Sequence, residues 1–332
     1  MRRPAIVTAM SLAALAAAPS LAHAQILGNP QPKPAPAPAP QGGKADVALG
    51  GGMGTKRADY FISGQTVTVT GTVSPFVAGQ VVTVSLRRGR RATAAKQVAV
   101  TRAARGRGRF VARFRVRRRG TLRAAVSHAA TPQQAAFSAA SKRLIVARFA
   151  AGPGSRGVKV RLLQRGLRRL GFAVSIGGAY GGGTARAVLA YRKTNNMKRT
   201  TRASAKIFSR VFRGRGAFRP RHPRAGYHVE FDWSRQVLAF VNRGRAVAVY
   251  HSSSGTSATP TVFGRFRFYR KQPGTNSKGM VHSNYFIGGY AIHGYKSVPT
   301  YPASHGCLRV PIPNAKAIDN RIRLGQTIFV YR

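Results

Sequence analysis

Alternating apolar and polar residues dominate the chain between residues 58 and 148. The stretches GQTVTVTGTV (64–73), GQVVTVSLRRG (79–89) and RFVARFRVRRRG (109–120) follow a two-residue period and are bounded by glycines. In the third stretch the apolar residues share one face and the arginines share the other, as in half-buried strands. Several short strands at this spacing predict an all-β domain of the immunoglobulin-like sandwich type, with a spacer or adhesion role.

The hydrophobic period changes to that of a helix after residue 154. In GSRGVKVRLLQRGLRRLGF (154–172), apolar residues recur at helical spacing and Gly171 follows as a stop signal. Thr184 stands where it would cap a second helix, TARAVLAYRK, which carries its own apolar stripe. These patterns predict a small helical module over residues 152–215.

Strand-like patterns return from His228 onwards. HVEFDWSRQVLAFVNRGRAVAVYHSSSG contains two apolar runs joined by a predicted turn at residues 242–245. Phenylalanine and arginine then alternate in GRFRF. The pattern predicts a mostly β domain over residues 222–332, so the whole chain is expected to be multidomain.

The first 57 residues differ from the rest in composition. MRRPAIVTAMSLAALAAAPSLAHAQ has an arginine pair, an apolar run too short to span a bilayer, and small residues before Gln25. This layout predicts a secretory signal peptide at residues 1–24, with an uncleaved anchor as the alternative. Residues 25–57 are rich in Pro, Ala and Gly and predict an extended linker. We therefore expect an exported protein with no integral membrane span after signal cleavage.

The charge balance points to anionic partners. The chain has 57 Lys and Arg against five acidic residues, a formal net charge of +52. For an exported protein the available polyanions are wall polymers and membrane head groups. Nucleic acid is not expected, because the basic residues are spread through every segment and no nucleic-acid-binding motif accompanies them. A general bias towards arginine and alanine would also explain the charge.

The scarcity of acidic residues narrows the possible chemistry. Only Glu230 and Asp232 offer a carboxylate pair of the glycosidase type in the C-terminal region, and such neighbours more often lie on a solvated edge. There is no HExxH motif and no Cys/His cluster with ligand spacing. We expect no metal or organic cofactor.

The only cysteine, Cys307, lies in the sequence SHGC near the C-terminus. An unpaired thiol in an exported protein favours a reactive role over that of a small buried hydrophobe. His293 and His305 are candidate bases, and the amides of Gly306 and Cys307 are candidates for an oxyanion hole. No acidic residue lies near in sequence, so a backbone carbonyl or a hydroxyl is expected to orient His293.

Four ordered segments between residues 226 and 332 extend this interpretation: HVEFDWSRQVLAFV, SSGTSATPTVFGRF, AIHG and SHGCLRV. They resemble the motifs of the YkuD family of L,D-transpeptidases, which use a cysteine on a β-rich fold. The resemblance implies Cys307 as the nucleophile and His293 as the proton acceptor and donor. It implies that His305 supports the geometry of the site.

The same resemblance nominates substrate-binding residues. Arg309 would contact substrate, since a guanidinium suits a carboxylate, although it is also one arginine among many. The remaining candidates are Ser304, Gly306 and Gly294. Gly294 departs from the family, in which other members carry Ser after the first histidine.

A second resemblance covers about residues 154–211. The order GSRGxxVxxLQxxLxxLGF and then GxYGxxTxxAVxxY is similar to the peptidoglycan-binding-domain-1 family, a three-helix wall-anchoring module. Tyr191 and Arg192 stand where that family usually has a Phe-Gln pair on the second helix. Together the two resemblances imply a protein of the cell wall or the periplasmic space.

The implied activity is peptidoglycan L,D-transpeptidation, with peptidoglycan stem peptides as substrates and a cysteine thioester as intermediate. The product would be a 3-3 cross-link, which joins the third residues of two stem peptides. Hydrolysis of the same thioester would make the protein an L,D-carboxypeptidase. A catalytically silent protein that binds the wall or other polyanions is the alternative from a different class.

Overall fold

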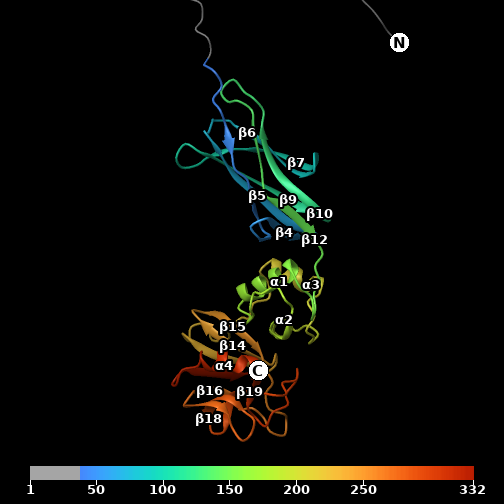
Figure 1. Ribbon diagram of the computed structural model, residues 1–332. Helices are drawn as coiled ribbons and strands as arrows, with labels where there is room; N and C mark the ends of the chain where they lie inside the picture. The colour runs from blue at the N-terminus through green and yellow to red at the C-terminus, as the bar shows by residue number, and fades with distance from the viewer. Residues whose placement is uncertain (1–37) are drawn as a thin grey trace, which may run out of the picture. The chain divides into compact units, whose positions relative to one another are not determined.

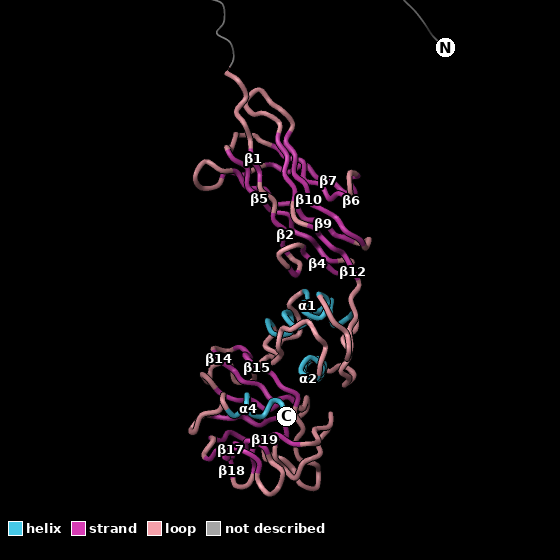
Figure 2. The backbone as a smooth tube through the Cα atoms, viewed as in Figure 1, coloured by secondary structure: helices cyan, strands magenta, loops and turns pink. Residues whose placement is uncertain are grey.

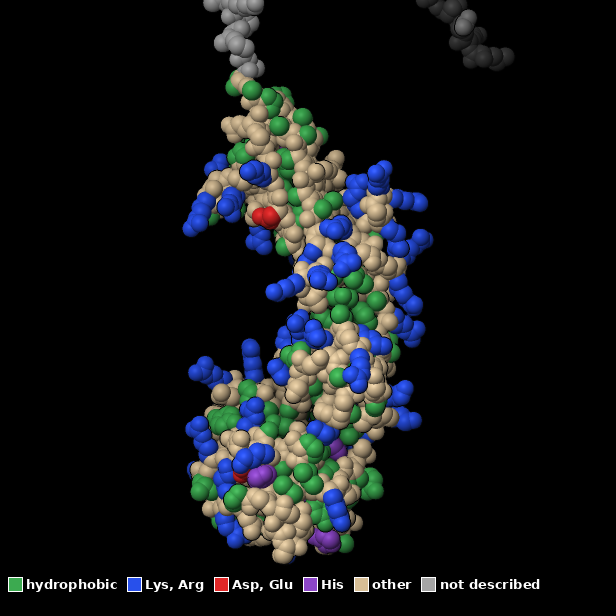
Figure 3. Space-filling view, in the orientation of Figure 1, with side chains coloured by type: hydrophobic (Ala, Val, Ile, Leu, Met, Phe, Trp, Pro, Cys, Tyr) green, Lys and Arg blue, Asp and Glu red, His purple; other side chains and the backbone are tan. Residues whose placement is uncertain are grey.

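The computed structural model describes residues 38–332 (Figures 1 and 2). The predicted signal peptide and the first part of the predicted linker lie outside these residues. Within 38–332, no helix is long and apolar enough to cross a membrane. In the face shown in Figure 3, Lys and Arg side chains occur on the β domain, the helical module and the C-terminal domain and are not gathered on one of them.

The N-terminal part of the described chain contains two β-sheets. One has the strand order β1-β5-β9-β8 with β2 also on β5, and the other has the order β3-β4-β12-β10-β6-β7 with β11 on β10. The strands are β1 (Lys44–Ala45), β2 (Ala48–Gly50), β3 (Met53–Gly54), β4 (Ala58–Ile62), β5 (Gln65–Ser74), β6 (Val81–Arg88), β7 (Arg91–Ala99), β8 (Thr101–Arg102), β9 (Gly108–Val116), β10 (Gly120–His128), β11 (Phe137–Ala140) and β12 (Arg143–Ala147).

The two sheets share one hydrophobic core, built from the apolar positions of the alternating pattern. In β9 every second residue is buried, and the arginines between them are exposed. Phe110 of β9, Val67 of β5 and Val84 of β6 belong to the same buried cluster. The strands expected at 64–73 and 79–89 are confirmed as β5 and β6. An immunoglobulin-like topology stays a prediction.

Part of the predicted linker is structured. Strands β1 and β2 pair antiparallel with β5, and β3 pairs with β4. The prediction of a tether is therefore wrong for residues 44–54. The physical reason is that Val47 and Leu49 pack against the core of the two sheets, which the glycine-rich composition around them conceals.

Three helices follow, α1 (Val158–Arg169), α2 (Gly182–Thr194) and α3 (Ala205–Phe212). The predicted capping role of Thr184 is wrong, because α2 starts at Gly182 and Gly181 is its N-cap. Thr184 is buried inside the first turn, where its hydroxyl accepts a hydrogen bond from the Gln164 amide at 2.8 Å.

The helices and the following sheet form one continuous core. The buried cluster that contains the helical residue Tyr191 also contains Val237, Ala239 and Val249. The backbone of Val249 also pairs with the segment after α1, since its N–H donates to the carbonyl of Gly171 at 2.8 Å. The helical module is thus joined to the C-terminal sheet by packing and by backbone hydrogen bonds.

The C-terminal part has a five-stranded sheet, β15-β14-β13-β21-β16, and a four-stranded sheet, β17-β18-β19-β20. The elements are β13 (His228–Asp232), β14 (Val237–Asn242), β15 (Arg245–His251), β16 (Gly264–Arg267), β17 (Arg270–Thr275), β18 (Val281–Ile287), β19 (Tyr290–Tyr295), β20 (Leu308–Pro311), α4 (Ile312–Asp319) and β21 (Thr327–Tyr331). The predicted turn at 242–245 is confirmed by the pairing of Asn242 with Arg245. Arg243 and Gly244 both have positive φ, as a type I′ turn requires.

Candidate active site

Two neighbouring strands bring the predicted site residues together. Strand β19 pairs in parallel with β20, and the register places His293 opposite Arg309 and Ile292 opposite Leu308. Cys307 directly precedes β20, so it lies beside Ala291, two residues from His293 along the neighbouring strand. Parallel pairing thus makes neighbours of the AIHG and SHGC segments, which are well separated along the chain.

His293 is buried and held in one orientation. Its Nδ1 lies 3.0 Å from the carbonyl oxygen of Gly294, which can only accept, so Nδ1 carries the proton. The expectation that a backbone carbonyl or a hydroxyl orients this ring is confirmed. Burial lowers the pKa of His293; the Gly294 carbonyl opposes this shift and the Arg309 charge adds to it. The imidazole is therefore neutral at neutral pH, with Nε2 able to accept a proton.

The Cys307 side chain is partly exposed and is not in a disulfide. Its Sγ lies 3.6 Å from the carbonyl oxygen of Gly289. Burial raises the pKa of the Cys307 thiol, against the opposing effects of the Ala291 backbone N–H and the charges of Arg309 and Lys278. The thiol is therefore protonated at neutral pH, and a base would have to remove its proton to make it a nucleophile.

The turn before Cys307 is stabilised by its own side chains. The Ser304 hydroxyl donates to the carbonyl of Cys307 at 2.5 Å and accepts from the N–H of Gly306 at 3.1 Å. Gly306 has a φ of +109°, and a Cβ there would lie 2.4 Å from the ring of Tyr290. Only glycine fits this position. The prediction of a free Gly306 amide for an oxyanion is wrong, because Ser304 already takes that N–H.

The other nominated residues lie in different environments. Gly294 packs under α4, and a Cβ there would be 2.7 Å from the Cβ of Ala315, so the serine found in other members would not fit without a shift. His305 is exposed, and within residues 38–332 its ring has no hydrogen-bond partner. Arg309 donates to the carbonyl of Ala303 at 2.9 Å and stacks on Tyr295 at 4.2 Å from the ring centre. Arg309 is thus a fixed part of the site and not a loose surface arginine.

The serine-rich segment after β15 holds the chain around Cys307 by hydrogen bonds, a role that the sequence analysis did not predict. Ser252 Oγ donates to the carbonyl of Arg309 at 2.8 Å, and the backbones of Ser253 and Arg309 exchange two hydrogen bonds. The carbonyl of Ser254 accepts from the backbone N–H groups of Ala303 and Ser304. The segment therefore holds both sides of Cys307. The signal in the sequence was a run of hydroxyl residues that the structure buries completely.

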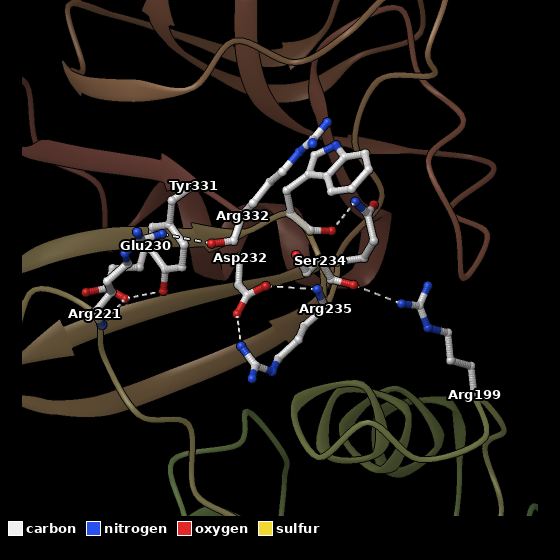
Figure 4. Close-up of polar contacts among 10 residues, drawn as sticks. Arg199, Arg221, Glu230, Asp232, Ser234, Arg235, Tyr331 and Arg332 are labelled. Carbon is white, nitrogen blue, oxygen red and sulfur yellow. Dashed lines mark hydrogen bonds and ion pairs between the residues drawn. The ribbon is translucent and has the colours of Figure 1, made fainter.

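The carboxylates of Glu230 and Asp232 are buried, and their oxygens accept hydrogen bonds from other groups of the protein (Figure 4). Glu230 accepts from Tyr331 at 2.6 Å and from His228 at 3.0 Å. It also accepts from the backbone N–H groups of Arg221 and His222, in the segment between α3 and β13. Asp232 accepts from Arg235. Both the glycosidase alternative and the solvated-edge interpretation are wrong, because this strand is buried on both faces. In the described part of the chain, no group of three His, Cys, Asp or Glu residues could hold a metal ion.

Comparison with known proteins agrees with this geometry. Residues 226–330 match the model of the YkuD family, the L,D-transpeptidase catalytic domain. The crystal structure of the L,D-transpeptidase (residues 123–326) from Xylanimonas cellulosilytica is 32% identical, with a TM-score of 0.51, and the match covers 56% of this chain and 98% of that one. The chain belongs to the YkuD family of L,D-transpeptidases.

Other structures are more distant. The L,D-transpeptidase from Stackebrandtia nassauensis is 17% identical with a TM-score of 0.34, over 55% of this chain and 95% of that one. The C442S mutant of the Enterococcus faecium L,D-transpeptidase is 20% identical with a TM-score of 0.29, over 32% and 50%. No curated protein matches the chain. The Xylanimonas match extends well beyond residues 226–330, so it includes part of the chain outside the catalytic domain.

Proposed function

We propose that this L,D-transpeptidase is exported and forms 3-3 cross-links in peptidoglycan, with Cys307 as the nucleophile and His293 as the general base and acid. One observation carries the proposal: the parallel pairing of β19 and β20 brings a protonated thiol, Cys307, and a neutral imidazole, His293, onto neighbouring segments, and the Nδ1–H of the imidazole donates to the Gly294 carbonyl. That pairing is what a cysteine acyl transfer needs at neutral pH.

The reaction follows from these protonation states. Nε2 of His293 takes the thiol proton as Sγ attacks the carbonyl of the third residue of a stem tetrapeptide. The amide C–N bond then breaks, and the imidazolium returns the proton to the nitrogen of the leaving D-alanine. The Gly294 carbonyl stabilises the imidazolium between these steps. The amine of a second stem peptide attacks the thioester carbonyl and gives its proton to His293. The C–S bond breaks as the new amide forms, and the imidazolium returns the proton to Sγ of Cys307.

The remaining roles follow from what each residue has free. Of the two amides considered for the oxyanion, that of Cys307 is the one left, since Ser304 takes the N–H of Gly306. Arg309 keeps donors beyond the one given to Ala303, and these suit a substrate carboxylate. Ser304, Gly306 and Gly294 shape the turn and the histidine and do not contact substrate. His305 is exposed to solvent and takes no part in the proton transfer.

The other modules are assigned roles on their resemblances and charge. We propose that the helical module anchors the enzyme to the wall and that the N-terminal β domain is a spacer. The high positive charge favours association with anionic wall polymers. Water in place of the acceptor amine would give an L,D-carboxypeptidase, and that outcome depends on access to the thioester.

The test is intact mass and product analysis of residues 25–332 incubated with a disaccharide-tetrapeptide, beside Cys307→Ala and His293→Ala. We expect a Cys307-dependent acyl adduct, loss of D-alanine and a dimeric muropeptide. Tripeptide without dimer would identify the carboxypeptidase. If wild-type protein binds sacculi but gives neither adduct nor product, the protein is a wall-binding protein and the proposal fails.

A further inference from the structure

Lys193 of α2 is the least expected buried group in the described chain. Its side chain is 1% exposed, and none of the ion pairs within residues 38–332 includes it. Lysines are almost never fully buried unless they are paired. The partners of Lys193 are neutral groups of the catalytic domain: Nζ lies 2.8 Å from the carbonyl oxygen of Ser252 and 2.9 Å from Nδ1 of His251.

The protonation pattern of this contact is defined by His251. Its Nε2 lies 2.9 Å from the carbonyl oxygen of Val298, which can only accept, so Nε2 carries the proton and Nδ1 accepts from Lys193. Burial lowers the pKa of His251 to about 3, with Lys193 adding to the shift. Burial and the nearby Arg199 lower the pKa of Lys193 to about 6. Two N–H groups of Lys193 are therefore used in directed hydrogen bonds, with little charge on the pair at neutral pH.

A second basic side chain of the helical module reaches the same part of the catalytic domain. Arg199, from the segment between α2 and α3, donates to the carbonyl of Thr300 and to that of Ser234 at 3.1 Å (Figure 4). Val298 and Thr300 both belong to the segment between His293 and Cys307. The helical module thus contacts this segment at Thr300 directly and at Val298 through His251.

Further hydrogen bonds connect the partners of Lys193 to the segments on both sides of Cys307. Ser252, whose carbonyl accepts from Lys193, donates through its hydroxyl to the carbonyl of Arg309. The next residue, Ser253, donates to the carbonyl of Tyr301 at 2.6 Å. Lys193 therefore fixes the start of the serine segment that holds the chain on both sides of Cys307.

We infer that Lys193 is a positioning residue of the active site, which acts through His251 and Ser252 on the segment that carries Cys307 and Arg309. The helical module is then part of the catalytic unit as well as a wall anchor. This inference rests on the proposed function. It agrees with the Xylanimonas match, which extends beyond the catalytic domain.

The test compares Lys193→Met with Lys206→Met in residues 25–332. Lys206 is an exposed lysine of α3, so its variant makes the same change of side chain without removing a buried contact. Turnover of a soluble disaccharide-tetrapeptide gives kcat and KM, and alkylation by iodoacetamide reports on Cys307 alone. Both are measured at a temperature at which circular dichroism shows each variant to be folded.

We expect Lys193→Met to lower kcat at least tenfold with KM changed less than threefold, and to change the alkylation rate at least threefold. Lys206→Met should match the wild type in both. Ser252→Ala should lower kcat as well, and its effect should be less than additive with that of Lys193→Met, because the two act on one set of contacts. A fall in stability alone would not produce this pattern in folded protein.

Unchanged kcat and alkylation in folded Lys193→Met overturn the inference. If Lys193→Met does not fold, Lys193→Gln, which keeps an N–H donor, is judged by the same criteria. If the wild type shows no turnover, the proposed function fails, and the alkylation rates still decide the inference. Equal rates in the wild type and the variant reject it, and a threefold difference that Lys206→Met does not share supports it.

Discussion

Replacement of Glu230 by glutamine should destabilise the protein without touching its chemistry. The Glu230 side chain is completely buried and accepts four hydrogen bonds, two of them from backbone N–H groups at 2.8 and 2.9 Å. His228 contacts it through Nε2 at 3.0 Å, and the Nδ1 of the same ring lies 2.9 Å from the carbonyl oxygen of Gly226. Burial raises the pKa of Glu230, but the hydrogen bonds from His228, Tyr331 and the backbone outweigh it, and the net pKa lies below its ordinary value.

The magnitude follows from what glutamine cannot do. Its NH₂ group would face a backbone N–H on either side of the carboxylate position, so a buried N–H donor would lose its acceptor. Leaving such a donor unsatisfied costs about 1–3 kcal/mol, and more where the lost acceptor was charged. With roughly 2–4 °C lost per kcal/mol in a unit of this size, Glu230→Gln should lower Tm by roughly 2–12 °C.

The assay is thermal and urea unfolding at pH 7, with Asp232→Asn as the matched control. Asp232 lies on the same strand, but its charged partner Arg235 is 41% exposed and remains hydrated after the change, so the control should lose less stability than Glu230→Gln. Because the pKa of Glu230 is lowered, the stabilisation is present above the ordinary pKa of glutamate and is lost as the pH falls through the folded value. Equal stabilities of the two variants at pH 7 would refute the reasoning. So would a Glu230→Gln protein of full stability that has lost activity per folded molecule, since that result would restore a catalytic role for the carboxylate.

Three further predictions concern the site. Gly306→Ala should lower kcat at least a hundredfold, because a Cβ would lie 2.4 Å from Tyr290 at a φ of +109°; activity within threefold of the wild type would contradict this role for glycine. Because burial raises the pKa of Cys307, its alkylation by iodoacetamide should be slower than that of free cysteine at pH 7 and should increase only in the alkaline range; a plateau below pH 7 would show a resting thiolate instead. Lys193, which contacts His251 and lies near Arg199, has a pKa of about 6 against 10.5 in the unfolded chain, so the unfolded state binds more protons between these values. Stability should therefore rise with pH across this window more steeply in the wild type than in Lys193→Met, and parallel Tm profiles would reject the shift.

The sequence determined the local elements and nominated the candidate reactive groups. Period-two alternation identified β5, β6 and β9, and helical spacing identified α1, because each pattern reflects which face of an element is buried. The lone cysteine and its neighbouring histidines could be recognised as a candidate site because few residue types can supply a nucleophile and a base. Composition misled at residues 44–54, where glycine-rich sequence forms short strands, because pairing with β5 and β4 depends on partners elsewhere in the chain.

Only the tertiary structure decided which groups are free to act. The Gly306 amide, Glu230 and Asp232 looked available in the sequence, yet each is occupied by a partner that folding supplies. Lys193 also has partners that only folding supplies, since they lie about sixty residues further along the chain, in another module. Burial and hydrogen-bond saturation depend on contacts between distant segments, so a one-dimensional pattern carries no record of them. The sequence therefore indicated the candidate chemistry, and the packing of helices against sheets determined which polar groups remain free for it.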